Sequence, residues 1–161
     1  MTVDPPAAAL QPVEPAYLKV LRARAAIFWL PLLAGSLVAD RLLLAELPIA
    51  GLLPVLIALV AVSGIAVAPA RIYRRLGYAI DDRLLRVVHG WLFHTDTIVP
   101  FVRVQHIDVT RGPIDKLFGT ASLVVHTAGT HNSIIVLPGL APDRASEIRE
   151  TIRGSIRADA E

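Results

Sequence analysis

The feature that most constrains this chain is a run of 24 residues, 47–70, without a charged side chain. About 20 apolar residues in a helix cross the roughly 30 Å hydrocarbon layer of a bilayer, whereas apolar runs of about 10–14 residues are typical of buried core helices. Pro48 stands at its start, where the missing N–H costs little, and a kink at Pro54 is tolerable within a membrane. The run therefore predicts a membrane-spanning helix over residues 47–70.

A second apolar stretch precedes this run. Its uncharged core, residues 25–39, would span only about 22 Å as a helix, so we extend the predicted span to residues 25–45, about 31 Å. The extension takes in Asp40 and Arg41. Arg41 can reach the headgroups with its long side chain, whereas an acid inside a membrane is a candidate functional group. The alternative, which we prefer, is that Asp40 lies at the interface where the helix frays.

Together the two stretches predict a transmembrane hairpin within residues 17–75. A cleavable signal peptide is disfavoured, because the bulky Leu37 stands three residues before Ala39, where a small residue is expected. Small residues recur in both spans, which allows close helix packing either within the hairpin or between two copies of the chain, and the sequence does not choose between these. These small residues are Gly35, Ala39, Ala61, Gly64 and Ala68.

Basic residues flank the predicted hairpin on both sides. They are Lys19, Arg22 and Arg24 before the first span, and Arg71, Arg74 and Arg75 after the second. Because the connecting turn contains Arg41 but no other basic residue, the positive-inside rule places both chain ends in the cytoplasm. The six flanking residues are membrane-interface candidates that could contact anionic headgroups, so the lipid bilayer is the first predicted partner.

Outside the spans the chain has two further regions. Residues 1–16 contain four prolines and no apolar periodicity, which predicts a disordered tail. Residues 76–161 have the composition of an ordinary globular domain, although the whole chain is 54% apolar and 19% charged. The chain contains no cysteine, so it has no disulfide and no thiolate metal site.

The first half of this domain has the pattern of a β-sheet. Residues 76–80 and 84–88 are apolar runs separated by Asp81-Asp82-Arg83, which predicts a hairpin. Residues 91–93 and 97–101 predict a further strand pair or one bent strand, ending at Pro100. In the next strand, 102–109, the apolar phase shifts, so that a strict period of two cannot bury both halves. We therefore predict a β-bulge or bend at Gln105-His106.

The second half of the domain combines turns, two strands and a helix. Gly112-Pro113 breaks the strand, and residues 113–118 fit one helical turn capped by Gly119. Strands are predicted over 121–127 and 133–137, joined by a turn that begins at Gly129 and followed by a break at Pro138-Gly139.

The last element is an amphipathic helix that begins near Pro142. Its apolar stripe is Ala145, Ile148, Ile152 and Ile156. A basic ridge beside this stripe consists of Arg149, Arg153 and Arg157. The stripe should pack on the sheet. The ridge either is solvated, which we prefer, or touches the membrane or an acidic partner.

The order of these elements resembles the bacterial PH-like domain family in its membrane-anchored form. The resemblance is carried by "LGYAIDDRLLRVVHGWLF" (76–93), "IVPFVRVQHIDVTRGPIDKLFGTASLVVHTAG" (98–129) and "IIVLPGL" (134–140). It implies a two-helix transmembrane hairpin followed by a mainly-β PH-like split barrel of about six or seven strands, with a C-terminal capping helix. It also implies a bacterial inner (plasma) membrane location, and little about activity. The structural or interaction candidates that it marks are Gln105, His106, Gly112, Pro113, Gly119 and Gly129.

Signatures of catalysis, cofactor binding and metal binding are absent from the sequence. The five histidines lack metal-ligand spacing, and for His106, near Asp108, a structural hydrogen bond is favoured over a metal. No nucleophile elbow and no phosphate-binding loop occur. Nucleic acid is not a predicted partner, because the basic residues flank the spans and do not line a groove with stacking aromatics. The acidic loop at Asp81 also disfavours a phosphoinositide site of the eukaryotic PH type.

Two hypotheses remain. In the first, the protein is a non-enzymatic membrane protein whose PH-like domain binds a protein partner, a second PH-domain membrane protein being one candidate, and homo-oligomers are open. In the second, the protein belongs to a transport, export, envelope-stress or antimicrobial-resistance system, with Asp40 as a proton or ligand group. A lipid or small ligand within the barrel is a third option. We favour the first.

Overall fold

The computed structural model describes residues 9–81, 83–91, 93–128 and 134–158, and the predicted turn at Gly129 lies outside them. The chain forms two compact units. One unit is Leu18–Arg71, and the other combines Met1–Tyr17 with Ile72–Glu161. The second unit is therefore discontinuous in sequence, with the first inserted into it.

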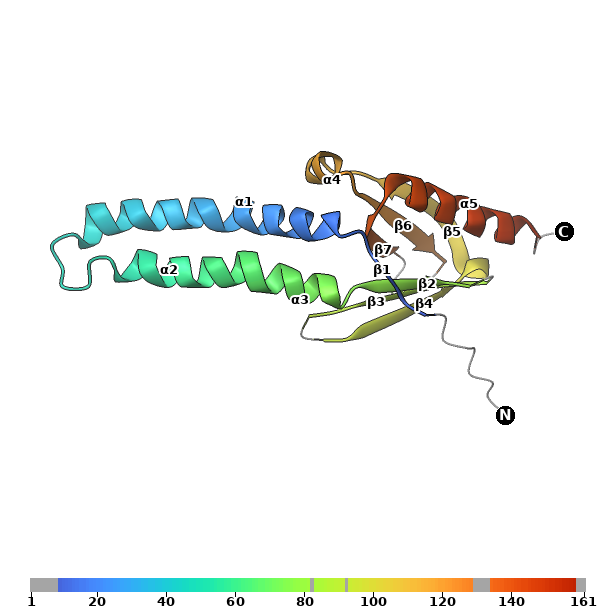
Figure 1. The fold of residues 1–161 in the computed structure, drawn as a ribbon, viewed down its shortest axis with the longest axis horizontal. Helices are drawn as coiled ribbons and strands as arrows, with labels where there is room; N and C mark the ends of the chain where they lie inside the picture. The colour runs from blue at the N-terminus through green and yellow to red at the C-terminus, as the bar shows by residue number, and fades with distance from the viewer. Residues whose placement is uncertain (1–8, 82, 92, 129–133, 159–161) are drawn as a thin grey trace. The chain divides into compact units, whose positions relative to one another are not determined.

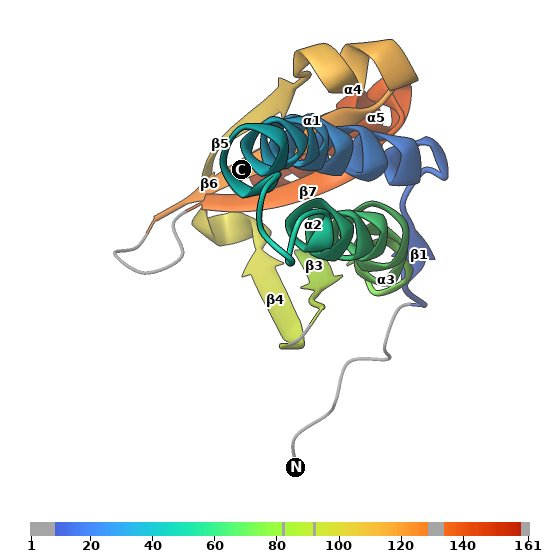
Figure 2. The same ribbon diagram turned by 90° about the vertical axis from the view of Figure 1, so that its left-hand side faces the viewer.

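The inserted unit is a helical hairpin. Helix α1 (Ala16–Ala39) continues into a π-helical segment (Asp40–Leu44), and after a turn the chain returns through α2 (Leu52–Val62), a second π-helical segment (Ser63–Val67) and α3 (Ala68–Arg74). Figures 1 and 2 show α1 and α2 antiparallel and side by side. The helices approach closely at Gly64, where an added Cβ would lie 2.3 Å from the Nε1 of Trp29. This contact shows small-residue packing within the hairpin.

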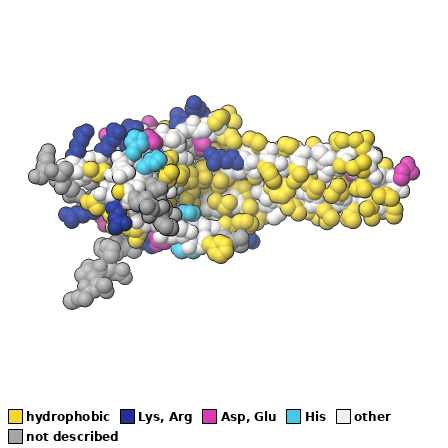
Figure 3. All heavy atoms as spheres, turned by 180° about the vertical axis from the view of Figure 1, so that it is seen from behind, with side chains coloured by type: hydrophobic (Ala, Val, Ile, Leu, Met, Phe, Trp, Pro, Cys, Tyr) yellow, Lys and Arg dark blue, Asp and Glu magenta, His cyan; other side chains and the backbone are white. Residues whose placement is uncertain are grey.

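Both arms of the hairpin are long and apolar enough to cross a membrane. The candidate spans are Ala16–Leu44 and Leu52–Arg74, and only 11% and 17% of their most apolar stretches are buried inside the protein. A core helix of a soluble protein would be mostly buried. Hydrophobic side chains cover the hairpin in Figure 3, as expected for a surface that meets lipid.

The arms differ in their bounds from the predicted spans. The first helix begins at Ala16, nine residues before the predicted start, since the Lys and Arg residues that precede the apolar core are good helix formers. The second begins at Leu52, because Gly51 at φ 85° ends the turn in a left-handed conformation. Pro54 therefore lies in the first helical turn and not in the interior of the span, and there it removes no intrahelical hydrogen bond.

Within its described residues, the second unit contains seven strands in two sheets and a C-terminal helix, which confirms the predicted PH-like fold. The first sheet has the order β1-β2-β3-β4 and the second β5-β6-β7. The strands of the first sheet are β1 (Gln11–Pro12), β2 (Gly77–Ile80), β3 (Leu84–His89) and β4 (Thr95–Pro100). Those of the second are β5 (Val104–Thr110), β6 (Ala121–Thr127) and β7 (Ile134–Leu140). All neighbours are antiparallel (Figure 1).

Helix α5 (Pro142–Ala158) packs on the second sheet through the predicted stripe. Ala145, Ile148 and Ile152 are fully or almost fully buried, and they meet a core that includes Leu123, Val125 and Leu137. Full burial of each isoleucine, leucine or valine among them stabilises the domain by about 1.5–3 kcal/mol.

The predicted bulge is confirmed, because the pairing register of β5 with β6 shifts between Val104 and His106. Helix α4 (Pro113–Phe118) ends at Gly119 in a left-handed conformation, also as expected. Two details differ. Trp91 and Phe93 lie in the turn between β3 and β4 and form no strand. Strand β7 also continues to Leu140, through Pro138-Gly139, where the sequence predicted a break. The strand can continue because its pairing with β6 shifts register between Ala121 and Leu123, which accommodates the proline and the glycine.

The structure differs from the predicted disordered tail at residues 11–16, and residues 1–8 lie outside the described part. Strand β1 pairs with β2, with Gln11 opposite Tyr78. Val13 is buried, and the Glu14 N–H donates to the Gly139 carbonyl at 2.8 Å. The sheet edge at β2 supplies backbone partners that apolar periodicity does not reveal. The PH-like domain therefore includes residues 10–17 as well as the predicted 76–161.

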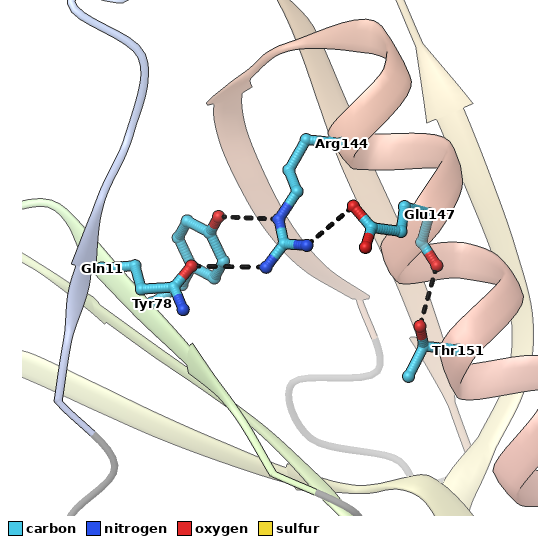
Figure 4. A network of polar contacts seen from close by, with 5 residues as sticks. All are labelled: Gln11, Tyr78, Arg144, Glu147 and Thr151. Atoms are coloured by element: carbon cyan, nitrogen blue, oxygen red, sulfur yellow. Dashed lines mark hydrogen bonds and ion pairs between the residues drawn. The ribbon is translucent and has the colours of Figure 1, made fainter.

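Arg144 on α5 ties this N-terminal segment to the C-terminal helix (Figure 4). Its guanidinium donates to the Tyr78 hydroxyl at 3.5 Å, to the Gln11 amide oxygen at 3.4 Å and to the Glu147 carboxylate at 2.7 Å. The hydrogen bonds to Tyr78, the larger effect, and to Glu147 raise the pKa of Arg144. One cation thus bridges β1, β2 and α5.

We predict that Gly139→Ala destabilises the domain. Gly139 has φ 75°, and an added Cβ would lie 2.5 Å from the Cγ of Tyr17. The left-handed conformation alone costs a residue with a Cβ about 1–2 kcal/mol. Thermal unfolding of the detergent-solubilised chain should show a lower midpoint for this variant.

The matched control is Gly154→Ala on α5, where an added Cβ meets nothing within 4 Å. Alanine is favoured over glycine in a helix by about 1 kcal/mol, so this variant should be as stable as the parent or more stable. Equal midpoints for Gly139→Ala and the parent would contradict the assignment of residues 10–17 to the domain.

Candidate functional site

One opening of the PH-like domain lies between two strand edges. Within the described residues, β4 pairs only with β3, and β7 only with β6. A cleft of about 270 Å³ lies between them. Its lining residues are His89, Thr95, Thr97, Ile134, Ile135 and Val136. None of these carries a formal charge when histidine is neutral.

The β7 side of this cleft is apolar and accessible. Ile134 and Val136 alternate with buried residues and are 56% and 46% exposed. A strand edge that is unpaired and exposes apolar side chains is a template for another chain, and proteins usually blunt such edges with charges or cover them. The geometry suits an extended peptide that would add backbone hydrogen bonds along β7.

A histidine–carboxylate cluster lies on the exposed side of β5 and β6. The Nε2 of His106 lies 2.9 Å from one oxygen of Asp108, and the Nε2 of His126 lies 3.5 Å from the other. The bulge brings His106 opposite His126, which sequence spacing alone could not show. Within the described part of the chain, no group of three such side chains is arranged to hold a metal ion. The contacts of Asp108 with His106 and His126 link the two strands.

Three of the remaining sequence candidates lie in the segment between β5 and β6, a loop that contains helix α4. Gly112 and Pro113 begin α4, and Gly119 ends it. Inside the loop, the buried Thr120 hydroxyl donates to the Asp115 carboxylate at 3.1 Å. Gln105 is exposed at the bulge and does not join this loop. The arrangement supports a structural role for the two glycines and the proline.

Charges on the outer face of the first sheet form a paired group. Arg86 on β3 donates through Nε to both oxygens of Asp96 on β4, at 2.9 and 3.0 Å. This hydrogen bonding lowers the pKa of the Asp96 carboxyl and raises the pKa of Arg86. Asp96 is thus compensated locally and adds little to the field around it.

Asp40 lies within a helix, not at a frayed end. It begins the π-helical segment after α1, and only 6% of its surface is exposed. Both carboxylate oxygens accept the N–H of Gly51, at 2.8 and 3.0 Å. Charge-assisted hydrogen bonds of this kind are roughly twice as strong as neutral ones. The acid therefore fastens the turn of the hairpin across eleven residues.

The six basic flanking residues lie on or next to the helices. Lys19, Arg22 and Arg24 are exposed on α1, Arg71 and Arg74 are exposed on α3, and Arg75 follows α3 directly. Their exposure and their positions at the ends of the apolar segments fit contact with headgroups.

Comparison with known proteins places the chain in a family. The sequence model of the family described as "Bacterial PH domain" matches residues 18–156, most of the chain. The chain belongs to the bacterial PH domain family. It is also 35% identical, over 75 residues, to the UPF0699 transmembrane protein YdbS of Bacillus subtilis (strain 168). This alignment covers 47% of the chain and 45% of the relative, so the chain spans about half the length of the curated relative that it matches. No solved structure matches the chain.

Together with the two apolar helical arms, these matches identify a membrane protein that carries a bacterial PH domain. Two of its features were not accessible to sequence reasoning. The β4–β7 cleft depends on the order of the strands in space. The partner of Asp40 is a backbone N–H, which every residue type except proline has, so the residue types do not reveal it. For the partner of Asp40, the one signal in the sequence was that this acid stands eleven residues before a glycine, Gly51.

We predict that Asp40→Ala loosens the hairpin turn. The loss of a charge-assisted acceptor leaves the Gly51 N–H without its partner, at a cost of about 1–3 kcal/mol. Because the chain has no cysteine, a single Ala50→Cys substitution provides a unique label in the turn. Maleimide should label it several-fold faster when Asp40→Ala is added.

Two further variants sharpen this test. Glu46→Ala removes the other acid of this region, which is exposed, and should leave the labelling rate unchanged. Asp40→Asn keeps an oxygen acceptor and should lie between the parent and Asp40→Ala. If the Asp40→Ala variant is labelled no faster than the parent, Asp40 does not stabilise the turn. A role of Asp40 in transport would then be open again.

Proposed function

We propose that this protein is a non-enzymatic, membrane-anchored interaction subunit. The hairpin crosses the bacterial inner membrane twice, with both chain ends in the cytoplasm. The PH-like domain stands at the cytoplasmic face and binds an extended segment of a protein partner in the β4–β7 cleft. The observation that carries the proposal is the exposed, uncharged edge of β7 beside that cleft.

The anchor supports the choice of partner. A protein that is tethered in the same membrane meets the cleft at a high effective concentration. Even a short peptide segment with weak intrinsic affinity would therefore occupy the cleft for a substantial fraction of the time. A second membrane protein is therefore the favoured partner. One that itself carries a PH domain fits well, because its own sheet would supply a suitable strand.

The hydrogen bonds of Asp40 argue against the alternative function in transport. Both of its oxygens are engaged by the hairpin turn, which leaves the acid in a structural role. Within the described residues, no other acid of the helical arms is buried. The alternative therefore loses the residue that motivated it.

We predict a two-span topology with both ends inside. Vesicles washed with alkaline carbonate should retain the protein. A phosphatase reporter that is active only outside the cytoplasm should be silent when fused to the C-terminus and active when inserted at Ala50, in the hairpin turn. Release by carbonate, or an active C-terminal fusion, would exclude the proposed anchoring.

We also predict that the cleft binds a partner in native membranes. A photo-crosslinking amino acid at Ile134 should give a discrete adduct, and Val136→Glu should abolish it by placing a charge at the apolar edge.

Leu117 on α4 serves as the control position, because it is 77% exposed and lies outside the cleft. Crosslinker at Leu117 should give no adduct of the same mass, and Leu117→Glu should leave the Ile134 adduct intact. Identical adducts from both positions, or none from Ile134, would count against the cleft.

A further inference from the structure

The turn between β3 and β4 displays two aromatic side chains. Trp91 is 43% exposed and Phe93 is 83% exposed. Gly90 imposes this geometry, since its φ is 147° and an added Cβ would lie 1.8 Å from the Phe93 carbonyl oxygen. The chain doubles back so tightly that only glycine fits. The exposure of these aromatics is therefore built into the turn.

The register of the first sheet fixes where this turn lies. Gly77 at the start of β2 is opposite Val88, and His89 is opposite Thr95. The turn therefore lies at the end of the sheet where the chain passes from α3 into β2. A hydrogen bond of 2.6 Å from Arg75 Nη1 to the Trp91 carbonyl joins the two segments.

A pocket of about 380 Å³ opens beside this hydrogen bond. Its apolar wall includes Leu10, Pro12 and Val88, and its polar wall includes Arg74, Arg75 and His94. The volume falls in the range of small-ligand sites, about 300–1,000 Å³. The pocket lies entirely within the PH-like domain and is separate from the β4–β7 cleft.

The polar wall of this pocket is basic. Among the described residues, neither Arg74 nor Arg75 forms an ion pair with a carboxylate. The nearby Asp96 is held by Arg86 on the outer face of the sheet. The combination of two guanidinium groups and an apolar wall suits a ligand that joins a phosphate to an apolar body.

We propose that this pocket binds the phosphate headgroup of an anionic phospholipid in the leaflet that the domain faces, with Trp91 and Phe93 inserted into the interfacial layer beside it. This inference rests on the proposed membrane anchoring. Helix α3 ends at Arg74, which is also the end of the second span, so the arginines and the turn bonded to Arg75 lie at headgroup depth. The indole of Trp91, an apolar ring with a polar N–H, favours that depth, and Phe93 adds apolar surface beside it.

The experiment uses the full chain in vesicles of phosphatidylcholine that contain phosphatidylglycerol. The chain has two tryptophans, so Trp29→Phe leaves Trp91 as its one tryptophan fluorophore. Brominated phosphatidylglycerol should quench Trp91 more than brominated phosphatidylcholine at equal mole fraction. Arg74→Gln should reduce this preference by more than the roughly fivefold that one arginine near an anionic surface contributes without a pocket.

Arg22→Gln is the matched control, since it removes a charge from the same predicted side of the membrane but outside the pocket. Because Arg22 is itself a candidate for headgroup contact without a pocket, this variant should lower the preference by about fivefold at most, and by less than Arg74→Gln does. Equal losses in Arg22→Gln and Arg74→Gln would show general surface attraction and overturn the site. Loss of the preference on addition of inorganic phosphate would assign the pocket to free phosphate and overturn the lipid assignment.

A second readout covers the event that Trp29→Phe does not fold, because Trp29 packs against Gly64. Phe93→Cys carrying a polarity-sensitive dye, in the chain that retains Trp29, should report an apolar environment in phosphatidylglycerol vesicles. A dye signal typical of water would overturn the inserted turn. If carbonate also releases the chain, the anchoring itself fails; if the chain stays in the vesicles, only the lipid site fails.

Discussion

The structure depends on the closure of one β-domain around a hydrophobic insertion. The decisive contacts are the pairing of β1 with β2 and the hydrogen bond from the Glu14 N–H to Gly139. The chain leaves the domain after Tyr17 and returns at Ile72. Without these contacts, one end of the insertion would be a loose tail and only the other would join the domain.

This closure joins residues that are far apart in sequence, which is entropically costly for a flexible chain. The hairpin reduces that cost, since its antiparallel arms bring their own two ends close together. The Asp40–Gly51 hydrogen bonds at the turn and the Gly64–Trp29 packing both favour the paired arms. The pairing of the arms and the folding of the domain therefore support each other. Gly139 and Arg144 matter because they hold the N-terminal segment on the domain: the Gly139 carbonyl accepts from the Glu14 N–H, and Arg144 donates to Gln11.

Sequence patterns predicted elements whose cause is local. The run without charges predicted the second arm, the phase shift between Val104 and Ile107 predicted the bulge, and Gly119 predicted the end of α4. Elements that depend on distant partners could not be predicted. Strand β1 has two residues next to a proline-rich segment and becomes a strand only because β2 offers it an edge. The two exposed aromatics looked like strand residues until the Gly90 turn placed them outside the sheet.

The same distinction applies to the sites. The flanking arginines could be found by counting charges, but the pocket that contains Arg74 and Arg75 is completed by Leu10, Pro12, Val88 and His94 from three separate segments. The cleft depends in the same way on the order of strands. Side-chain chemistry was visible in the sequence, whereas the surfaces that combine it are products of topology.

The two proposed surfaces meet at one turn, which gives them a physical connection. His89 and His94 flank this turn, and His89 lines the β4–β7 cleft while His94 lines the arginine pocket. A lipid that holds Trp91 and Phe93 at the interface would restrict the turn, and with it the ends of β3 and β4. A protein segment in the cleft would then meet a more ordered edge and lose less entropy on binding. Because coupling between two binding sites is reciprocal, the partner would strengthen lipid binding by the same factor.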